Sequence, residues 1–291
     1  MFLCPTAVAV VLTTVATRGW AFGGVRRWSA MRVSPPRMSA RGELDELRSS
    51  LVATIDGVVP LSLKEDHAAG LGARTLNEGI TGSCDGYLGL PKIGWCSATR
   101  LDSATCSFLH LSAQVAPNYD VPHLSLDVTV PASGGPVTID YDLTAREDVV
   151  GNKNYVANYY EAAEPWFDAA KAKVTLVPNA AAPLAMRALA SPVALHAVAN
   201  SVADASSVAE KLVGLWSNWL VTPTEINRMK RGAAYSRDTA MHKQRWIHYS
   251  GLVANTLGGV APQRAAEIAS ALAGPGDEAY TGGGGGSAEG V

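Results

Sequence analysis

The feature that most constrains the fold is a pair of alternating stretches joined by a short turn. Residues 122–130 alternate strictly between apolar and polar side chains, and residues 137–143 repeat the pattern. The linker 131–135 (PASGG) is rich in turn-forming residues. Because successive side chains of a strand point to opposite faces, the two stretches predict an antiparallel hairpin with one apolar and one polar face.

Further strands and helices are expected on both sides of this hairpin. Residues 104–112 alternate around Phe108 and His110 and predict a third strand. Leucines at helical spacing predict a helix over 43–55, whereas residues 63–95 are Gly-rich and expected to be irregular. Helices are expected at 154–172 (broken near Pro165), 206–232 (interrupted by Pro223), 238–246 and 262–272, and short strands at 173–178 and 191–199. Consecutive strands flanked by helices favour an α+β domain over a repeated βαβ fold.

The first 41 residues have the composition of a targeting sequence. They contain six arginines and no acid, and residues 6–17 form an apolar run. That run is too short to span a membrane and fits the core of a signal peptide. An Ala21-Phe22 step and an Arg/Ser-rich stretch follow, an order that predicts a bipartite plastid presequence and a location in the stroma of an algal secondary plastid. We therefore divide the chain into a presequence (1–41), a folded body (42–273) and a flexible Gly-rich tail (274–291).

The charge and the motifs of the folded body exclude several classes of protein. With the six presequence arginines set aside, residues 42–291 (the body together with the tail) carry 18 basic residues against 26 acidic ones, a net charge of −8, which argues against nucleic-acid binding. No G-x-G-x-x-G motif follows a predicted strand, and no Walker A, G-x-S-x-G or H-E-x-x-H motif occurs. Cys84, Cys96 and Cys106 lack the close spacing of metal or cluster ligands and are expected to be buried thiols in a reducing compartment.

Two groups of side chains are candidates for function. His110, His123, Asp127, Asp140 and Asp142 fall on the polar sides of the predicted strands. They line an interior pocket suited to proton donation if helices cover both faces of the sheet, and a solvated surface if helices do not. Basic residues gather at 228–245 and form either a docking surface for an acidic partner or a solvated helix face.

Several segments carry a resemblance in a shared order along the chain. They are NEGITGSCDGYL (77–88), APNYDVPHLSLDV (116–128), IDYDLTAREDVVGNKNYVANYYE (139–161), PLAMRALASPVAL (183–195), SRDTAMHKQRWIH (236–248) and APQRAAEI (261–268). Together they resemble red chlorophyll catabolite reductase and, more broadly, the ferredoxin-dependent bilin reductases. The resemblance implies a three-layer α/β/α sandwich around a central antiparallel sheet, with a pair of strands at 183–195. It also implies an enzyme without a bound redox cofactor, which takes single electrons from reduced ferredoxin and adds protons to an open-chain tetrapyrrole.

The resemblance also suggests roles for individual residues. Asp127 matches the family's catalytic acid, and His110 matches a catalytic histidine of some bilin reductases. Arg187, Ser191 and Trp95 are expected to bind the substrate. The family's second acid, an aspartate, falls at 247–250, where this chain reads IHYS and has no carboxylate. His248 is the candidate replacement, because an imidazole titrates near neutrality.

Three functions remain open from the sequence. The leading expectation is a reductase of chlorophyll breakdown, which the Arg-x-Asp turn and the Ser-Pro segment favour. A reductase of biliverdin-type substrates that makes phycobilins is favoured by YDVPHLSLD and His110. A non-catalytic tetrapyrrole carrier on the same scaffold is the third, and it is favoured if His248 does not replace the missing acid.

Overall fold

The computed structural model describes residues 37–63, 80–178, 184–256 and 262–274. These residues belong to one compact unit, Pro36–Val291. The expected presequence as far as residue 36, and the Gly-rich tail from residue 275, lie outside the described residues. No helix of the described ranges is both long and apolar enough to cross a membrane.

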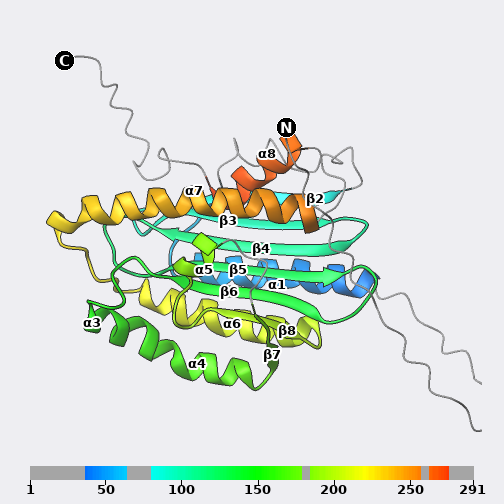
Figure 1. Cartoon of the computed structure of the whole chain (residues 1–291), viewed down its shortest axis with the longest axis horizontal. Coiled ribbons are helices and arrows are strands. Elements are labelled where there is room, and N and C mark those ends of the chain that lie inside the picture. Colours follow the sequence, from blue (N-terminus) through cyan, green and yellow to red (C-terminus); the bar gives the residue numbers. More distant parts are fainter. Residues whose placement is uncertain (1–36, 64–79, 179–183, 257–261, 275–291) are drawn as a thin grey trace, which may run out of the picture. The chain divides into compact units, whose positions relative to one another are not determined.

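The described part of the chain forms one sheet of eight strands in the order β1-β2-β3-β4-β5-β6-β8-β7 (Figure 1). The strands are β1 (Ser62–Leu63), β2 (Thr81–Gly89), β3 (Ile93–Asp102), β4 (Cys106–Val115), β5 (His123–Pro131), β6 (Val137–Thr144), β7 (Val174–Leu176) and β8 (Leu195–Ala199). All neighbouring strands are antiparallel. The predicted hairpin is confirmed as β5 and β6, which pair with Leu126 opposite Tyr141.

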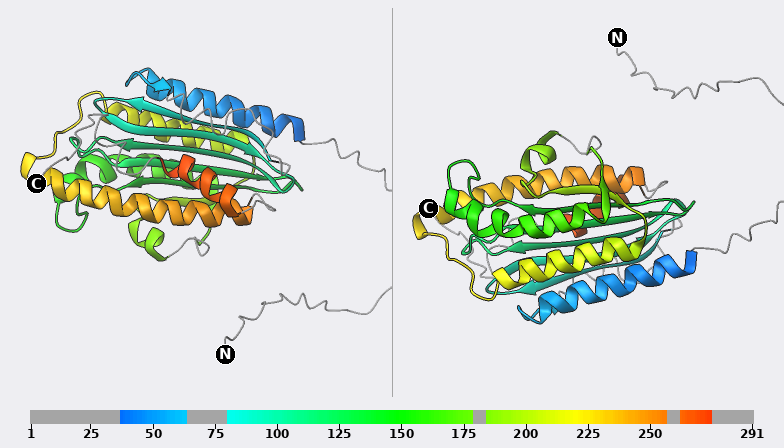
Figure 2. Two further views of the ribbon diagram at one scale, coloured as in Figure 1. Left: turned by 90° about the horizontal axis from the view of Figure 1, so that it is seen from above. Right: turned by 90° about the horizontal axis from the view of Figure 1, so that it is seen from below.

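Helices cover both faces of this sheet, as the two views of Figure 2 show. One face carries α1 (Arg37–Asp56), α6 (Val202–Trp219) and α4 (Ala162–Lys171), with α3 (Lys153–Tyr155) and the π-helical segment η1 (Val156–Glu161) leading into α4. The other face carries α5 (Leu184–Leu189), α7 (Arg231–Thr256) and α8 (Pro262–Ala273), and a 3₁₀ turn, η2 (Arg228–Lys230), leads into α7. The three-layer α/β/α sandwich expected from the sequence is confirmed.

The larger core lies between the sheet and the helices α1 and α6. The apolar side chains of β5 (Leu124, Leu126 and Val128) share one buried cluster with leucines of α1 and with Leu212 and Trp216 of α6. Each fully buried side chain of this kind contributes roughly 1.5–3 kcal/mol to folding. Because strand side chains alternate, the polar side of β5 faces the opposite helical layer, α7 and α8.

The Gly-rich stretch 63–95 was expected to be irregular, and this expectation was wrong for its described residues. Leu63 ends β1, and residues 80–95 comprise β2, a short turn and the start of β3, while residues 64–79 lie outside the described ranges. A Cβ atom on Gly86 would lie 2.3 Å from the ring of Trp95, and one on Gly82, at φ +143°, would lie 1.9 Å from the carbonyl oxygen of Arg100. Glycine therefore marks close approach between paired strands here, a contact that a local sequence window does not detect.

Several expected boundaries also differ from the structure. The helix expected over 154–172 is irregular at η1, and Pro165 lies after this irregularity within α4. Residues 220–230 separate α6 from α7, where one interrupted helix was expected. Residues 184–189, expected as a strand, form the helix α5, and β8 begins only at Leu195.

Candidate active site

A row of polar side chains crosses the sheet on the face that α7 and α8 cover. Thr99, His110, Asp127, Asp140 and His196 lie directly opposite one another on successive strands from β3 to β8. Opposed residues share one face of a sheet, so these five form a continuous line, which we call the polar row. Of the two alternatives left open by the sequence, the interior arrangement is therefore the correct one for this row.

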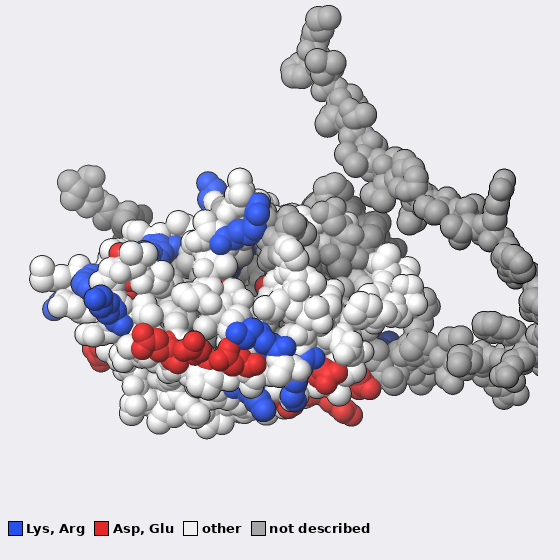
Figure 3. All heavy atoms as spheres, turned by 60° about the horizontal axis from the view of Figure 1, so that its bottom comes forward, with Lys and Arg blue, Asp and Glu red and all other residues white. Residues whose placement is uncertain are grey.

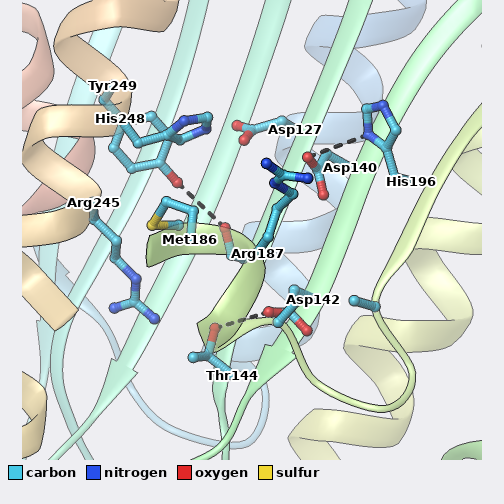
Figure 4. A pocket seen from close by; sticks show the side chains of 13 residues that line it. Asp127, Asp140, Asp142, Thr144, Met186, Arg187, His196, Arg245, His248 and Tyr249 are labelled. Atoms are coloured by element: carbon cyan, nitrogen blue, oxygen red, sulfur yellow. Dashed lines mark hydrogen bonds and ion pairs between the residues drawn. The ribbon is translucent and has the colours of Figure 1, made fainter. Parts of the chain in front are cut away.

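The middle of the polar row opens into a cavity of about 200 Å³, which we call the central pocket (Figure 4). Three carboxyl groups from the sheet line it: Asp127, Asp140 and Asp142. The helices contribute Arg187 from α5 and Arg245, His248 and Tyr249 from α7. Acids, bases and an aromatic hydroxyl from four elements thus converge on one small space, an arrangement suited to binding a charged ligand and exchanging protons with it.

His110 and Asp127 form a hydrogen-bonded pair at the inner wall of this pocket. His110 Nδ1 lies 2.7 Å from Asp127 Oδ1, and His110 Nε2 lies 3.2 Å from the carbonyl oxygen of Leu272 on α8. A carbonyl oxygen can only accept, so we assign a proton to Nε2. Nδ1 then accepts from a protonated Asp127 or, in an imidazolium, donates to an ionised one. In both arrangements the pair holds one exchangeable proton beside the pocket.

Asp142 is a second acid of the pocket with an unusual environment. It accepts hydrogen bonds from the backbone N–H of Ser191 (3.1 Å) and from the Thr144 hydroxyl (3.2 Å). Burial nevertheless raises the pKa of Asp142, and the nearby charge of Asp140 acts in the same direction. A carboxyl group of this kind holds a proton more readily than an exposed aspartate does.

The helix α7 supplies the roof of the pocket. The Tyr249 hydroxyl lies 3.3 Å from Ser125 Oγ, and its ring meets the ring of His110 edge-on at 4.8 Å. Burial raises the pKa of Tyr249 well above its ordinary value, so its hydroxyl stays protonated. Arg245 is 4% exposed, and its Nη2 atom has no hydrogen-bond partner within the described residues. An unpaired buried guanidinium is costly, and an anionic group of a ligand in the pocket would relieve that cost.

A buried charge network holds α7 in place over the pocket. His123 Nδ1 accepts from the N–H of Val115 at 3.0 Å, so its Nε2 donates to Asp238 Oδ1 at 2.9 Å. The guanidinium of Arg146 pairs with the other oxygen of Asp238. Burial lowers the pKa of His123 to about 4, whereas His123 and Arg146 hold the pKa of Asp238 below its ordinary value in spite of burial. Asp238, Arg245 and Tyr249 are spaced as i, i+7 and i+11, which places them on one helical face.

The structure brings together most of the residues singled out from the sequence. Asp127, Arg187 and His248 line the central pocket, and His110 contacts it through Asp127. Ser191 lies behind the pocket and holds Asp142 by its backbone N–H. Trp95 lies elsewhere: it is 1% exposed, and its ring packs on Gly86 and Gly274.

Three titratable residues of the pocket were not assigned there from the sequence. His196 lies on β8, a strand of only five residues, where alternation is too short to be informative. Arg245 was grouped with the surface bases, although its position on α7 faces inward. Tyr249 lies in the IHYS segment, in which only His248 was assigned a role. For the last two, helical spacing from the buried Asp238 is the signal that would have identified them.

A second hollow, of about 430 Å³, lies between α1 and the edge of the sheet and includes Arg48, Asp85 and Tyr87. It is larger, but Arg48 and Asp85 already neutralise each other in an ion pair. It also lacks a histidine–carboxylate pair, so we place the candidate site in the central pocket.

The described residues also bear on metal and thiol chemistry. Within the described ranges, no group of three His, Cys, Asp or Glu side chains is arranged to hold a metal ion. Cys84, Cys96 and Cys106 are buried, as expected, and burial raises the pKa of Cys96 to about 12. A thiol of this kind is unreactive at neutral pH.

Comparison with known proteins identifies the fold. No protein-family model matches the sequence, and no curated protein sequence matches it either. The structure is similar to the crystal structure of phytochromobilin synthase from tomato in complex with biliverdin, with a TM-score of 0.61 and 12% sequence identity over 82% of this chain and 87% of that chain. At this identity the similarity establishes that the chain shares the fold of that bilin-bound synthase.

Proposed function

We propose that the protein is an oxidoreductase that reduces an open-chain tetrapyrrole with single electrons from reduced ferredoxin. The observation that carries this proposal is the His110–Asp127 pair, which holds a proton at the wall of a pocket in a fold shared with a biliverdin-bound synthase. The family resemblance of the sequence supports the same reaction. Under this proposal the protein needs no resident redox cofactor, because the electrons arrive from ferredoxin.

The chemistry of such a reaction requires protons at fixed positions. Two one-electron transfers and two protons convert one C=C bond of the tetrapyrrole into CH–CH. The first electron makes the conjugated system more basic, and an acid in contact with it then delivers a proton. Under this proposal, Asp127 is loaded through His110 and delivers this first proton.

The positive side chains of the pocket suit the acidic side chains of a tetrapyrrole. Arg245 offers an unpaired buried Nη2, and Arg187 extends from α5 toward the polar row (Figure 4). Guanidinium groups bind carboxylates in a bidentate manner. The cavity is below the roughly 300–1,000 Å³ typical of ligand sites, so we expect it to enclose the reacting part of the substrate while the remaining rings extend beyond its walls.

Two kinds of open-chain tetrapyrrole are candidate substrates, and experiment distinguishes them. The sequence resemblance favours a red chlorophyll catabolite, whereas the bilin complex of the structural neighbour favours a biliverdin-type substrate. The non-catalytic carrier also remains a candidate, and the absence of a carboxylate at His248 is the observation that favours it.

Electron supply and location complete the proposal. We expect ferredoxin, an acidic partner, to dock on the basic cluster at 228–243, where Arg228, Lys230, Arg237 and Lys243 are exposed. On the face seen in Figure 3, a band of acidic side chains lies between groups of basic ones. We also propose import into a plastid, tested with a fluorescent fusion of the presequence. The Phe22→Ala fusion should remain outside the stroma, and its unchanged import would contradict the bipartite presequence.

The deciding experiment is anaerobic incubation of the full chain with reduced ferredoxin and each tetrapyrrole, followed by absorbance. Loss of conjugation with one of them identifies the substrate. A shifted spectrum without turnover would support the carrier and contradict the reductase.

A further inference from the structure

The polar row contains a second histidine–carboxylate pair that faces the first. Asp140 lies directly opposite Asp127 on the neighbouring strand, and His196 lies directly opposite Asp140. His196 Nδ1 is 3.4 Å from Asp140 Oδ2, an ion-pair distance without the geometry of a hydrogen bond. Both residues line the central pocket (Figure 4). The order along the row is therefore histidine, aspartate, aspartate, histidine, with the two carboxyl groups in the middle.

The two pairs differ in their access to water. The side chains of His110 and Asp127 are 0% and 14% exposed, whereas those of His196 and Asp140 are 22% and 33% exposed. Carboxylates placed opposite each other repel when both are ionised, and a proton on one of them or a cationic imidazole beside it relieves the repulsion. A partly exposed imidazole can take up such a proton from solvent and pass it on to its carboxylate.

We propose that Asp140 and His196 form the second proton-donating pair of the reaction, so that Asp140 delivers the proton that follows the second electron. This inference rests on the proposed function. Each of two reduced iron–sulfur proteins gives up one electron, the C=C π bond of the tetrapyrrole breaks, and two C–H bonds form. Asp127 supplies one proton and Asp140 the other. The His196 imidazolium then donates its Nδ1 proton to the Asp140 carboxylate, becomes a neutral imidazole, and takes up a new proton from solvent.

This assignment gives the second proton a source and a supply route. The sequence offered His248 for the role, but within the described residues no hydrogen bond joins the His248 ring to another group, and its ring contact is with Tyr249 at 5.3 Å. Asp140, in contrast, has a neighbouring imidazole. The other titratable and charged groups that face the pair across the pocket are Asp127, Asp142, Arg187, Arg245, His248 and Tyr249.

Single-turnover and steady-state reduction by Asp140→Asn and His196→Gln, in the full chain, test the proposal. Asp168→Asn, the same change on an exposed residue of α4, is the matched control. Asp140→Asn should bind the substrate within about threefold of wild type and lose roughly 100-fold in turnover. Without the second proton to drive the second electron transfer to completion, the one-electron-reduced radical should accumulate and be detected by electron paramagnetic resonance. His196→Gln should complete the first turnover at nearly the wild-type rate and then slow about tenfold, because Asp140 is loaded beforehand but not reloaded.

The outcomes separate this inference from the proposed function. If wild type reduces the tetrapyrrole and both variants match it in rate and pH profile, the second pair is not a donor, although the reductase stands. Weaker binding with an unchanged rate in Asp140→Asn would make Asp140 a binding contact and overturn the proposal. If wild type reduces no tetrapyrrole, the proposed function fails and this inference fails with it. If Asp140→Asn does not fold, His196→Gln alone decides whether the second pair donates a proton, because it changes only a partly exposed side chain.

Discussion

The imidazole of His110 and the carboxyl group of Asp127, opposed on β4 and β5, share a hydrogen bond of 2.7 Å. The Nε2 atom of the same imidazole donates a hydrogen bond to the carbonyl oxygen of Leu272, near the end of α8. A helix from the C-terminal part of the chain thus sets the protonation of a pair that lies on β4 and β5, more than a hundred residues earlier. The proton-donating ability of the site therefore depends on how α8 packs against the sheet.

Asp127→Asn should slow reduction by roughly 100- to 10,000-fold, because the amide has the shape of the acid but no proton to give. Binding of the tetrapyrrole should stay within about threefold of wild type, since general-acid catalysis does not require ground-state affinity. Stopped-flow absorbance measures the rate, and a spectral titration measures binding. Asp168→Asn serves again as the control. Near wild-type turnover in Asp127→Asn would remove this residue from the mechanism.

Arg245→Gln should weaken binding of a carboxylate-bearing tetrapyrrole by roughly tenfold or more, since a charge-assisted hydrogen bond contributes about 1.5–3 kcal/mol. Its effect on the rate at saturating substrate should be smaller. Arg41→Gln, on α1 and 58% exposed, removes only a surface ion pair with Asp102 and should bind normally. Equal affinity of Arg245→Gln and wild type would show that the unpaired guanidinium does not contact the substrate.

The part of the site that the sequence predicts well is the part encoded by local alternation. Asp127, Asp140 and Asp142 lie on strands whose apolar partners repeat every second residue, so their shared face follows from the pattern alone. The pairing of His110 with Asp127 requires only that β4 adjoin β5 in the antiparallel register observed.

The remainder depends on contacts that no local pattern contains. Gly86 suggests a loop, but it is glycine because the ring of Trp95 packs on it. Trp95 was expected at the substrate, yet its indole fills the core between that glycine and Gly274. Arg245 is indistinguishable from its basic neighbours until Asp238 is known to be buried against Arg146 and His123. Non-local packing therefore decides which charged residues of α7 face the pocket.

The stability of the fold should fall as the pH decreases from about 6.5 toward 4. His123 is neutral in the folded protein with a pKa of about 4, whereas in the unfolded chain it titrates near about 6.5. The stabilisation that comes from keeping His123 neutral is complete at pH values above the pKa of His123 in the unfolded chain. It is lost as the pH falls through this window, and the free energy of unfolding decreases by about 3 kcal/mol at most. The depressed pKa of Asp238 acts in the same direction at still lower pH. Thermal unfolding followed by circular dichroism measures the effect.

The control for this prediction is His123→Asn, which should be less stable at pH 7 but show a flatter dependence between pH 6.5 and 4. The substitution removes the titrating imidazole while keeping a side chain that can donate to Asp238. A wild-type melting temperature that stays constant across this range would contradict the assignment of a neutral, buried His123.

Arg228→Glu combined with Lys230→Glu should slow ferredoxin-driven turnover while a small chemical reductant still supports the wild-type rate. Both residues are exposed at η2, ahead of α7, in a body of negative net charge. Charge steering is screened by salt, so the difference between variant and wild type should shrink as ionic strength rises. An unchanged ferredoxin-driven rate at low salt would place the docking surface elsewhere.

His248→Ala should retain the rate of reduction within about tenfold and keep the wild-type pH profile, even though this position is where the family's second acid would fall. The physical reason is the surroundings of the ring. It lines the pocket beside Tyr249, but no hydrogen bond within the described part of the chain links it to a proton source. Asp140, which has His196 beside it, is better placed to be reloaded between turnovers. We therefore expect His248 to shape the pocket, and the alanine variant to show a modestly weaker affinity for the tetrapyrrole.

Parallel pH–rate profiles of His248→Ala, Asp140→Asn and wild type, measured with the same ferredoxin, separate the two assignments. If the alanine variant loses roughly 100-fold in rate together with the alkaline limb of the profile, while Asp140→Asn keeps both, His248 is the second donor and the pair on β6 and β8 is not.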